Sequence, residues 1–272
     1  MQNKTVVITG ATSGIGEVAA LRLAQQGARI VFVGRDKKRA GNTLEHLPAT
    51  AAHSFILADL SLLAEQKRVA TELSAEPAID VLINNAGALF NNRVETADGL
   101  ERTFALNHMG YFTITNLLLP KLKPGARIVS VASRAHQGAA LNFDDLQMRS
   151  SFGGWRAYAN SKLCNILFNR ALAKRLEGTG ITANCLHPGF VATRFGDESG
   201  GVVQRLVAVA KPMGAITPEE GARTIIHLAS SPAVEGISGE YFFESKIATP
   251  SQAARSDESA ERLWEISGKI AG

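Results

Sequence analysis

The sequence predicts an α/β protein with a doubly wound, mainly parallel sheet that carries helices on both faces. Short apolar segments of strand length alternate along the chain with longer segments of helical periodicity. The first apolar segment also ends in a glycine-rich turn that leads directly into a helix. No repeat, low-complexity segment or linker divides the 272 residues. We therefore expect a single domain with about seven strands.

The first half of the chain shows four strand–helix units. Each strand is a run of apolar residues of the kind that fills a sheet buried on both faces. Each helix carries apolar residues at a spacing of three or four. The expected strands are residues 4–9, 29–33, 55–58 and 79–84, and the expected helices are residues 15–26, 36–47, 62–76 and 97–122. Pro124 and Gly125 are expected to close the last and longest of these helices.

The second half continues the alternation but contains two long irregular segments. Residues 134–154 and 188–218 have no clear period and contain several glycines, so both are predicted to be loops. Long loops in compact domains are often functional. The remaining expected strands are residues 127–131, 181–186 and 240–243, and the remaining helices are residues 155–176 and 218–229. A polar tail follows and ends in a helical segment around residues 263–266.

Composition and charge exclude several classes of protein. The net charge of +4 comes from scattered basic residues, so we expect no nucleic-acid partner. Cys164 and Cys185 lie in apolar segments without metal-ligand spacing, so we expect buried free thiols and no metal site. No apolar run reaches the ~20 residues of a membrane span. Nothing resembles a signal peptide, so a cytoplasmic location is expected.

The glycine-rich turn at residues 9–16 (TGATSGIG) predicts a dinucleotide-binding site in a Rossmann-type sheet. Gly10 permits the tight turn, Gly14 lets a pyrophosphate approach the backbone, and Gly16 lets the helix pack close to the strand. The N-terminus of the following helix offers free N–H groups and a partial positive charge. The candidate phosphate-binding residues are Gly10, Thr12, Ser13, Gly14, Ile15 and Gly16.

The end of the second strand indicates which dinucleotide is bound. A carboxylate at this position would bind a free ribose 2′-hydroxyl and repel a 2′-phosphate. Gly34 fills that position here, and Arg35, which can grip a phosphate through its planar guanidinium, follows it. The sequence therefore favours NADP(H). A shift of one residue would instead place Asp36 near the ribose, which keeps NAD(H) open.

A tyrosine and a lysine four residues apart predict a proton-transfer pair. On a helix, Tyr158 and Lys162 share one face. A fixed positive charge favours the phenolate and lowers the pKa of a tyrosine below its usual value of about 10. The pair is therefore expected to exchange a proton with a substrate oxygen.

Taken together, these motifs resemble the short-chain dehydrogenase/reductase superfamily over residues 4–243. The motifs that carry the resemblance are residues 9–16, residues 84–87 (NNAG), Ser133, Tyr158 with Lys162, and residues 187–189 (HPG). Residues 33–36 (VGRD), 133–136 (SRAH), 158–168 (YANSKLCNILF) and 186–193 (LHPGFVAT) are similar to the retinol-dehydrogenase-like branch.

The resemblance implies a role for each matching residue. Tyr158 would donate or accept the proton, and Ser133 would hydrogen-bond the substrate oxygen. Lys162 would bind the nicotinamide ribose and lower the pKa of Tyr158, and Asn107 would hold a water on a proton relay to Lys162. The further cofactor residues implied by the resemblance are Asp59 and Leu60 near adenine, Asn85, Ala86 and Gly87 along the cofactor, and Pro188, Gly189, Val191 and Thr193 beside the nicotinamide.

The substrate is expected between the two long loops. Residues 4–243 would form the core, residues 190–215 a substrate loop and residues 245–272 a tail. Their apolar content favours an apolar carbonyl compound or alcohol as the substrate. Beside Ser133, the candidate substrate-binding residues are Phe143, Phe152, Phe190, Phe195 and Leu206.

The predicted function is that of an NADP(H)-dependent oxidoreductase that interconverts a carbonyl group and an alcohol. Two alternatives stay open: a non-catalytic NADP(H)-binding or sensing protein on the same fold, and a dehydratase or epimerase. Family members often pair through the two long helices, here residues 97–122 and 155–176, so a homodimer or homotetramer is also expected.

Overall fold

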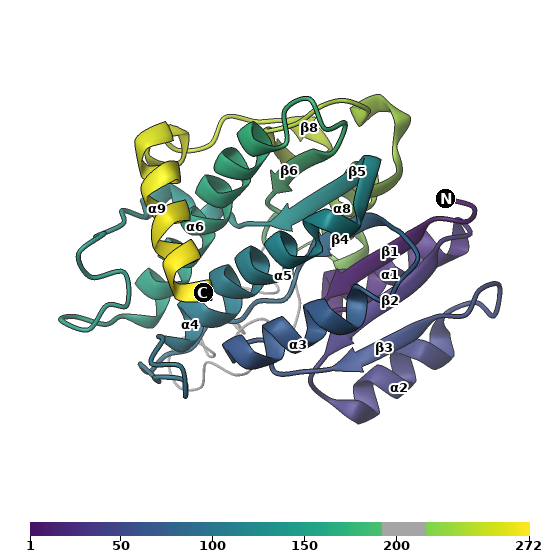
Figure 1. The fold of residues 1–272 in the computed structure, drawn as a ribbon, viewed down its shortest axis with the longest axis horizontal. Helices are drawn as coiled ribbons and strands as arrows, with labels where there is room; N and C mark the ends of the chain where they lie inside the picture. The colour runs from purple at the N-terminus through teal and green to yellow at the C-terminus, as the bar shows by residue number, and fades with distance from the viewer. Residues whose placement is uncertain (192–215) are drawn as a thin grey trace.

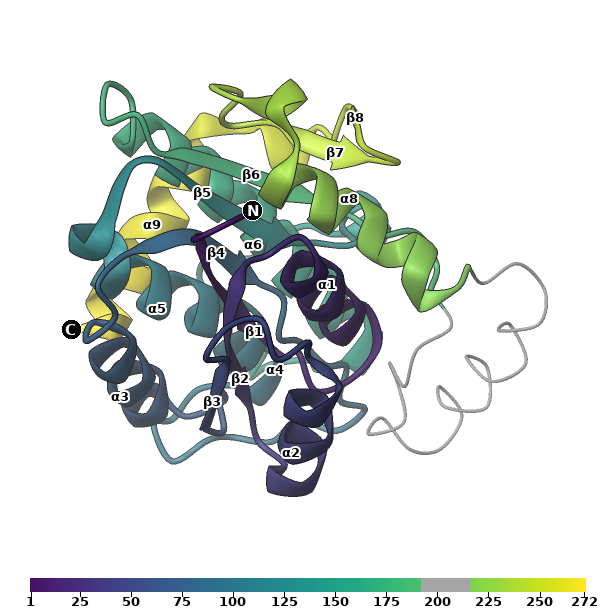
Figure 2. The same cartoon turned by 90° about the vertical axis from the view of Figure 1, so that its right-hand side faces the viewer.

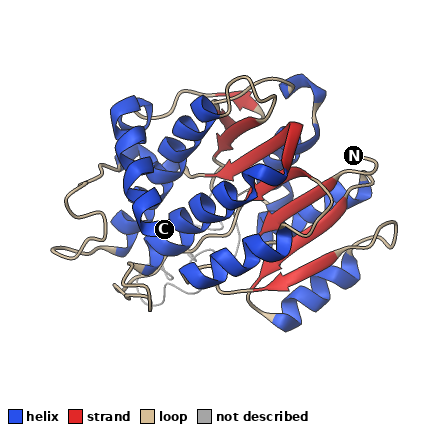
Figure 3. Cartoon of the chain, in the orientation of Figure 1, coloured by secondary structure: helices blue, strands red, loops and turns tan. Residues whose placement is uncertain are grey.

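The computed structural model describes residues 1–191 and 216–272. These residues form one eight-stranded sheet with the order β3-β2-β1-β4-β5-β6-β7-β8 (Figures 1 and 3). All neighbouring strands pair in parallel except β7 and β8, which pair antiparallel. The predicted doubly wound α/β fold is confirmed.

The structure sets the bounds of the elements within a few residues of those predicted for most of them. The strands are β1 (Thr5–Thr9), β2 (Arg29–Gly34), β3 (Ser54–Leu57), β4 (Ile79–Asn84), β5 (Leu122–Val131), β6 (Thr182–Leu186), β7 (Tyr241–Phe243) and β8 (Lys246–Ile247). The main helices are α1 (Gly14–Gln25), α2 (Lys37–His46), α3 (Leu63–Leu73), α5 (Gly110–Leu118), α6 (Gly154–Arg175), α8 (Pro218–Ser230) and α9 (Asp257–Ala271).

The two faces of the sheet carry separate hydrophobic cores. One core joins the sheet to α3, α5, α6 and α9, and the other joins it to α1, α2 and α8 (Figure 2). Because the central strands are covered on both faces, their residues are buried almost without alternation; Val6, Val7 and Ile8 are each fully buried. This explains why the strands read as continuous apolar runs in the sequence.

The predicted helix over residues 97–122 is wrong at its start and in its interior. The helical segment begins with α4 (Arg102–Phe104). Glu101 precedes α4, and its side chain accepts hydrogen bonds from the backbone N–H groups of Thr103 and Phe104. It then passes through a π-helical segment, η1 (Ala105–Met109), before α5. A 3-10 turn (Leu119–Lys121) ends it. Side-chain capping and a π turn leave no trace in hydrophobic periodicity.

Three smaller differences also concern local geometry. Pro124 and Gly125 lie inside β5, at a register shift opposite β4, and do not terminate a helix. The predicted loop at residues 134–154 opens with a 3-10 turn, η3 (Arg134–Gly138). The two-residue strand β8 was too short to predict, and it accounts for the eighth strand.

The parallel strands bring the candidate residues to one edge of the sheet. The turns after β1, β3, β4, β5 and β6, together with the end of β2, all lie at the carboxyl ends of their strands. This edge is where open α/β sheets bind ligands. Across residues 1–191 and 216–272, no helix is both long and apolar enough to cross a bilayer.

Candidate active site

The glycine-rich turn places the N-terminus of α1 at the carboxyl edge of β1. Gly10 and Gly14 both have positive φ, at +72° and +60°, a conformation that favours glycine. Ser13 precedes α1, and its side chain makes no capping hydrogen bond, so the first N–H groups of α1 are not capped from that position. These residues fit a pyrophosphate at the helix N-terminus.

Asn85 and Ala86 lock this turn to the neighbouring strand. The Asn85 side-chain amide donates to the carbonyl oxygens of Thr9 (2.9 Å) and Gly10 (3.0 Å). A Cβ on Gly16 would lie 2.4 Å from the Asn85 amide nitrogen, and a Cβ on Gly10 would lie 2.7 Å from Ala86 Cα. Both glycines therefore permit close approaches within the protein, and Gly16 does let α1 pack close to the sheet, as its position predicted.

The three residues at the end of β2 that were expected to lie near the adenosine ribose have different surroundings. A Cβ on Gly34 would lie 2.4 Å from Thr12 Cγ2, so an acidic side chain at this position would force Thr12 to move. The Asp36 carboxylate accepts from the backbone N–H of Arg39 (2.9 Å) and caps α2, an interaction that lowers its pKa. Arg35 lies on the surface between these two residues.

The turns after β3 and β6 lie at the same edge. Asp59 accepts from the backbone N–H and the hydroxyl of Ser61 (2.9 and 2.7 Å), and Leu60 beside it is buried. Gly189 has a φ of +90°. The side chains of Val191 and Ile15 lie side by side, because both come within 3 Å of a Cβ built on Gly221 in α8. Thr193 lies outside the described residues.

Ser133 and Tyr158 are brought together by η3 and α6. The Ser133 hydroxyl lies close enough to the Tyr158 hydroxyl to favour its ionised form. The Ser133 hydroxyl oxygen accepts from the backbone N–H of Ala135 (3.2 Å), so its own proton can be donated to another oxygen. The pair of hydroxyl groups thus presents two donors at one place, as two hydrogen bonds to a substrate oxygen require.

Lys162 lies under Tyr158, buried, with its ammonium 5.7 Å from the centre of the Tyr158 ring. Its Nζ donates to the carbonyl oxygen of Val131 (2.9 Å). The same oxygen accepts weaker hydrogen bonds from Asn165 and Tyr111, both at 3.4 Å. Lys162 is therefore held at the end of β5, close to Ser133.

Burial dominates the protonation of this pair. Burial raises the pKa of Tyr158 to about 12, although the neighbouring Ser133 hydroxyl opposes the rise. Burial also lowers the pKa of Lys162 to about 7, because the charged ammonium loses its hydration. The expected lowering of the Tyr158 pKa by Lys162 is therefore wrong for the chain by itself. Tyr158 is a neutral phenol at pH 7, suited to donating a proton.

The π-helical segment aims Asn107 into the site. The Asn107 side chain is fully buried; its amide donates to the carbonyl oxygen of Ala88 and to the hydroxyl of Ser161, and its Oδ1 accepts from the N–H of Ala88, all at 2.9 Å. A Cβ on Gly87 would lie 3.2 Å from Asn107 Oδ1 and 3.3 Å from Lys162 Nζ. Asn107, Gly87 and Lys162 thus meet around one point.

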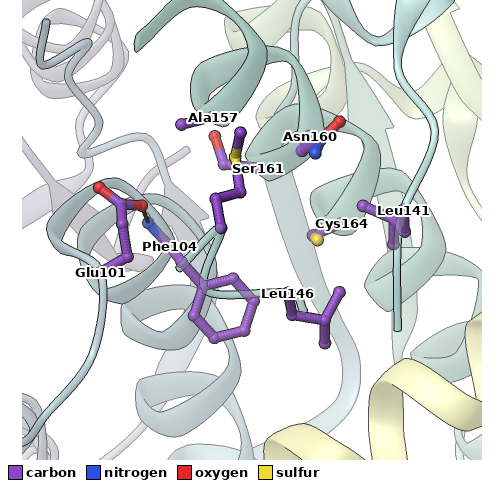
Figure 4. A pocket seen from close by; sticks show the side chains of 9 residues that line it. Glu101, Phe104, Leu141, Leu146, Ala157, Asn160, Ser161 and Cys164 are labelled. Atoms are coloured by element: carbon purple, nitrogen blue, oxygen red, sulfur yellow. Dashed lines mark hydrogen bonds between the residues drawn. The ribbon is translucent and has the colours of Figure 1, made fainter. Parts of the chain in front are cut away.

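A small cavity lies beside α6. Its volume is about 10 Å³, room for no more than one water. Figure 4 shows Ala157, Asn160, Ser161 and Cys164 of α6 along one side of it and Glu101 and Phe104 on another. These α6 residues lie on a different side of the helix from Tyr158 and Lys162, and the cavity is too small for an organic substrate.

The candidate substrate residues divide into three groups. Phe190 is exposed after β6, and Phe152 is half-buried before α6. The Phe143 ring packs against the hydrophobic core under the guanidinium of Arg262 in α9 (4.7 Å), so its described contacts face the C-terminal helix. Phe195 and Leu206 lie outside the described residues.

Sequence reasoning missed several residues that the structure adds to the site. Trp155 lies one turn before Tyr158, with its ring centre 5.9 Å from that of Tyr158 and with 57% of its surface exposed. Asn165 and Tyr111 share the Val131 carbonyl with Lys162. A signal existed for all three, because they lie three or four residues from Tyr158, Lys162 and Asn107 on the same helices.

Comparison with known proteins agrees with this geometry. The family model for short chain dehydrogenases matches residues 4–200. Human retinol dehydrogenase 14 is 40% identical and human retinol dehydrogenase 12 is 37% identical; each alignment covers 100% of this chain and 87% of the relative. A crystal structure of an uncharacterised Mycobacterium paratuberculosis protein has a TM-score of 0.81 at 31% identity, covering 99% of this chain and 94% of that one.

A second solved structure holds a dinucleotide. The complex of Pseudomonas aeruginosa RhlG with NADP has a TM-score of 0.71 at 28% identity and covers 89% of this chain and 94% of that one. The chain belongs to the short-chain dehydrogenase family, whose members are oxidoreductases of alcohol and carbonyl groups. Within the family it belongs to the retinol-dehydrogenase-like branch.

Proposed function

We propose that this protein uses NADP(H) to interconvert an apolar carbonyl compound and its alcohol at Ser133 and Tyr158. The observation that carries the reaction is the pair of neighbouring hydroxyl groups at the carboxyl edge of β5, with a buried lysine beneath them. NADP(H) would supply or accept the hydride.

The chain's own residues would manage the charge and the proton. When a carbonyl group is reduced, negative charge develops on its oxygen, and Ser133 and Tyr158 would stabilise that charge with two hydrogen bonds. Tyr158, with its pKa raised to about 12 by burial, is neutral at pH 7 and would give its proton to this oxygen. Lys162 and the turn around Asn85 and Gly87 would hold the nicotinamide ribose beside them.

The preference for NADP(H) rests on the end of β2. An acidic side chain at Gly34, of the kind that would select NAD(H), would have to displace the Thr12 side chain, and Asp36 is used to cap α2. Arg35 would bind the 2′-phosphate with charge-assisted hydrogen bonds. The NADP complex of the Pseudomonas aeruginosa relative supports this choice.

An apolar substrate is supported by two exposed aromatic side chains. Trp155 at the start of α6 and Phe190 after β6 leave 57% and 49% of their surfaces exposed. Trp155 is also in ring contact with Tyr158. An apolar substrate would cover such a surface as it reaches the two hydroxyl groups.

The decisive experiment measures hydride transfer from NADPH to a panel of ketones and aldehydes. Tyr158→Phe keeps the ring and removes the proton, so its kcat should fall by roughly 10²–10⁴-fold while NADPH still binds. Wild type and Tyr158→Phe that bind NADPH equally but are both inert would favour a cofactor-binding protein instead. Substrate conversion without net oxidation of NADPH would favour a dehydratase or epimerase.

A further inference from the structure

Two buried histidines outside the reaction link the catalytic elements to the C-terminal part of the chain. His108, next to Asn107, contacts the hydroxyl of Ser267 in α9 through Nε2 (2.7 Å). His136, three residues after Ser133, contacts the backbone N–H of Ser251. Both side chains are fully buried, and burial lowers the pKa of each. His136 lies closer to the chemistry.

The contacts of His136 define its protonation state. Its Nδ1 lies 2.7 Å from the Ser133 carbonyl oxygen, which can only accept, so Nδ1 carries the proton. Its Nε2 lies 3.1 Å from the Ser251 backbone nitrogen, which can only donate, so Nε2 is unprotonated. The neutral ring therefore bridges two backbone groups, those of Ser133 and Ser251, that are far apart in the chain.

The bridge ends on the backbone of the catalytic serine. The Ser133 carbonyl oxygen accepts both from the His136 ring and from the His136 N–H (3.2 Å), while the Ser133 hydroxyl accepts from the Ala135 N–H (3.2 Å). The edge of the His136 ring also packs against Tyr241 of β7, with centroids 5.2 Å apart. The turn that carries Ser133 is thus held from β7 and from the segment around Ser251.

We propose that His136 is a positioning residue for Ser133, and that the backbone of Ser251 holds it in the required tautomer and orientation. The C-terminal segment around Ser251 then belongs to the support of the active site. This inference rests on the proposed role of Ser133 at the substrate oxygen. A displacement of about 1 Å at a reacting group can cost on the order of 10²-fold in rate.

Two substitutions of His136 test its two hydrogen bonds one at a time. His136→Asn places an amide near the position of Nδ1 and can still donate to the Ser133 carbonyl, while His136→Gln places its amide near Nε2 and can still accept from Ser251. His136→Gln should lower kcat at least about tenfold, leave the KM for NADPH nearly unchanged and raise the isotope effect with 4-deuterated NADPH. His136→Asn should lower kcat less than His136→Gln does.

The matched control is His53→Gln. His53 also bridges two backbone groups, the N–H of Ile30 (3.0 Å) and the carbonyl oxygen of Pro48 (2.9 Å), but it lies at the opposite end of the strands. Its substitution should change the free energy of unfolding without changing the isotope effect. An equal change of isotope effect in His53→Gln would overturn the inference.

A double-mutant cycle with Ser133→Ala isolates the path of the effect. A residue that acts through Ser133 has nothing left to position in that background, so adding His136→Gln should lower kcat no further. If the kcat losses of the two single variants multiply in the double variant, the inference is overturned. It is also overturned if His136→Gln has the wild-type rate and isotope effect. A wild type without hydride transfer would instead overturn the proposed function.

A second measurement needs no turnover. The interaction between Ser133 and Tyr158 can be followed by NMR of enzyme with ¹³C at the tyrosine ring carbon that bears the hydroxyl. His136→Gln should shift the Tyr158 signal toward its position in Ser133→Ala. A wild-type signal in His136→Gln would overturn the inference even if no substrate has been found.

Discussion

Burial shifts the pKa values of Tyr158 and Lys162 in opposite directions. Burial favours the neutral form of both, so it raises the pKa of the tyrosine to about 12 and lowers that of the lysine to about 7. In the folded chain the lysine is therefore easily deprotonated, whereas in the unfolded chain its pKa is that of an ordinary lysine, 10.5. The burial of this lysine thus has a cost in stability.

We expect Lys162→Met to be more stable than the wild type at pH 6. The unfolded state binds more protons than the folded state between pH 7 and pH 10.5, so the stability of the wild type rises with pH over that window. The advantage of the variant should be on the order of 5 kcal/mol at pH 6 and should shrink toward pH 10. Asn165 and Tyr111 still donate to Val131 in the variant. Urea unfolding at both pH values measures it, and a less stable variant at pH 6 contradicts it.

We expect Arg35→Ala to weaken the use of NADPH selectively. The loss of charge-assisted hydrogen bonds to a 2′-phosphate should lower kcat/KM with NADPH by about 10–100-fold and lower it far less with NADH. Lys38→Ala, a nearby surface charge on α2, is the control. An equal effect of Arg35→Ala on both dinucleotides would remove the basis for the NADP(H) preference.

At the scale of elements, the π-helical segment η1 joins the stability of the fold to the site. One extra residue in this turn redirects the side chains around it, and Asn107 points inward to bind both backbone groups of Ala88 and the hydroxyl of Ser161. Ser161 in turn donates to the Tyr158 carbonyl oxygen (2.7 Å). The segment after β4 and helix α6 are therefore held together through one amide.

We expect Asn107→Ala to lower both stability and activity. Without the amide, the N–H and the carbonyl group of Ala88 lose their partner, which should lower the free energy of unfolding by about 2–4 kcal/mol. Thr113→Val on α5 is the control, because the buried Thr113 hydroxyl has no partner among the described residues and its loss should cost less than about 1 kcal/mol. Chemical unfolding of both variants tests this, and equal stabilities would contradict it.

At the scale of the whole molecule, α9 covers the long helices that were expected to pair two copies of the chain. Trp264 of α9 stacks on Phe168 of α6 with centroids 5.8 Å apart and packs edge-on against Phe112 of α5 at 5.0 Å. Asp257 forms ion pairs with Arg170 and Lys174 of α6. Figure 1 shows α9 lying across these helices. The chain itself occupies much of the face that pairing would need.

We therefore expect no dimer formed through α5 and α6. Light scattering coupled to size exclusion should give the mass of a single chain. If it gives a larger mass, the Leu117→Lys variant should form the same assembly as the wild type. Leu117 is 47% exposed on α5 and would lie within such an interface. A dimer that Leu117→Lys dissociates would contradict this expectation and support pairing through the long helices.

The sequence by itself determined the order of strands and helices, the glycine turn and the spacing of the proton-transfer pair. These features are local: a strand buried on both faces must be apolar throughout, a tight turn at positive φ favours glycine, and four residues place Tyr158 and Lys162 on one side of a helix. Gly10, Gly14 and the Tyr158/Lys162 spacing could be interpreted without knowing any neighbour.

Only the tertiary structure decided what these residues touch. The contact between Gly34 and Thr12 and the bridge from Ser251 through His136 to Ser133 join residues that are distant in the chain. The π turn at Asn107 and the exposure of Trp155 likewise depend on how the elements pack. It also set the direction of the pKa shifts, because the fixed charge of a lysine favours a phenolate only where burial does not outweigh it. Hydration is lost when the whole sheet closes, and no local pattern records that loss.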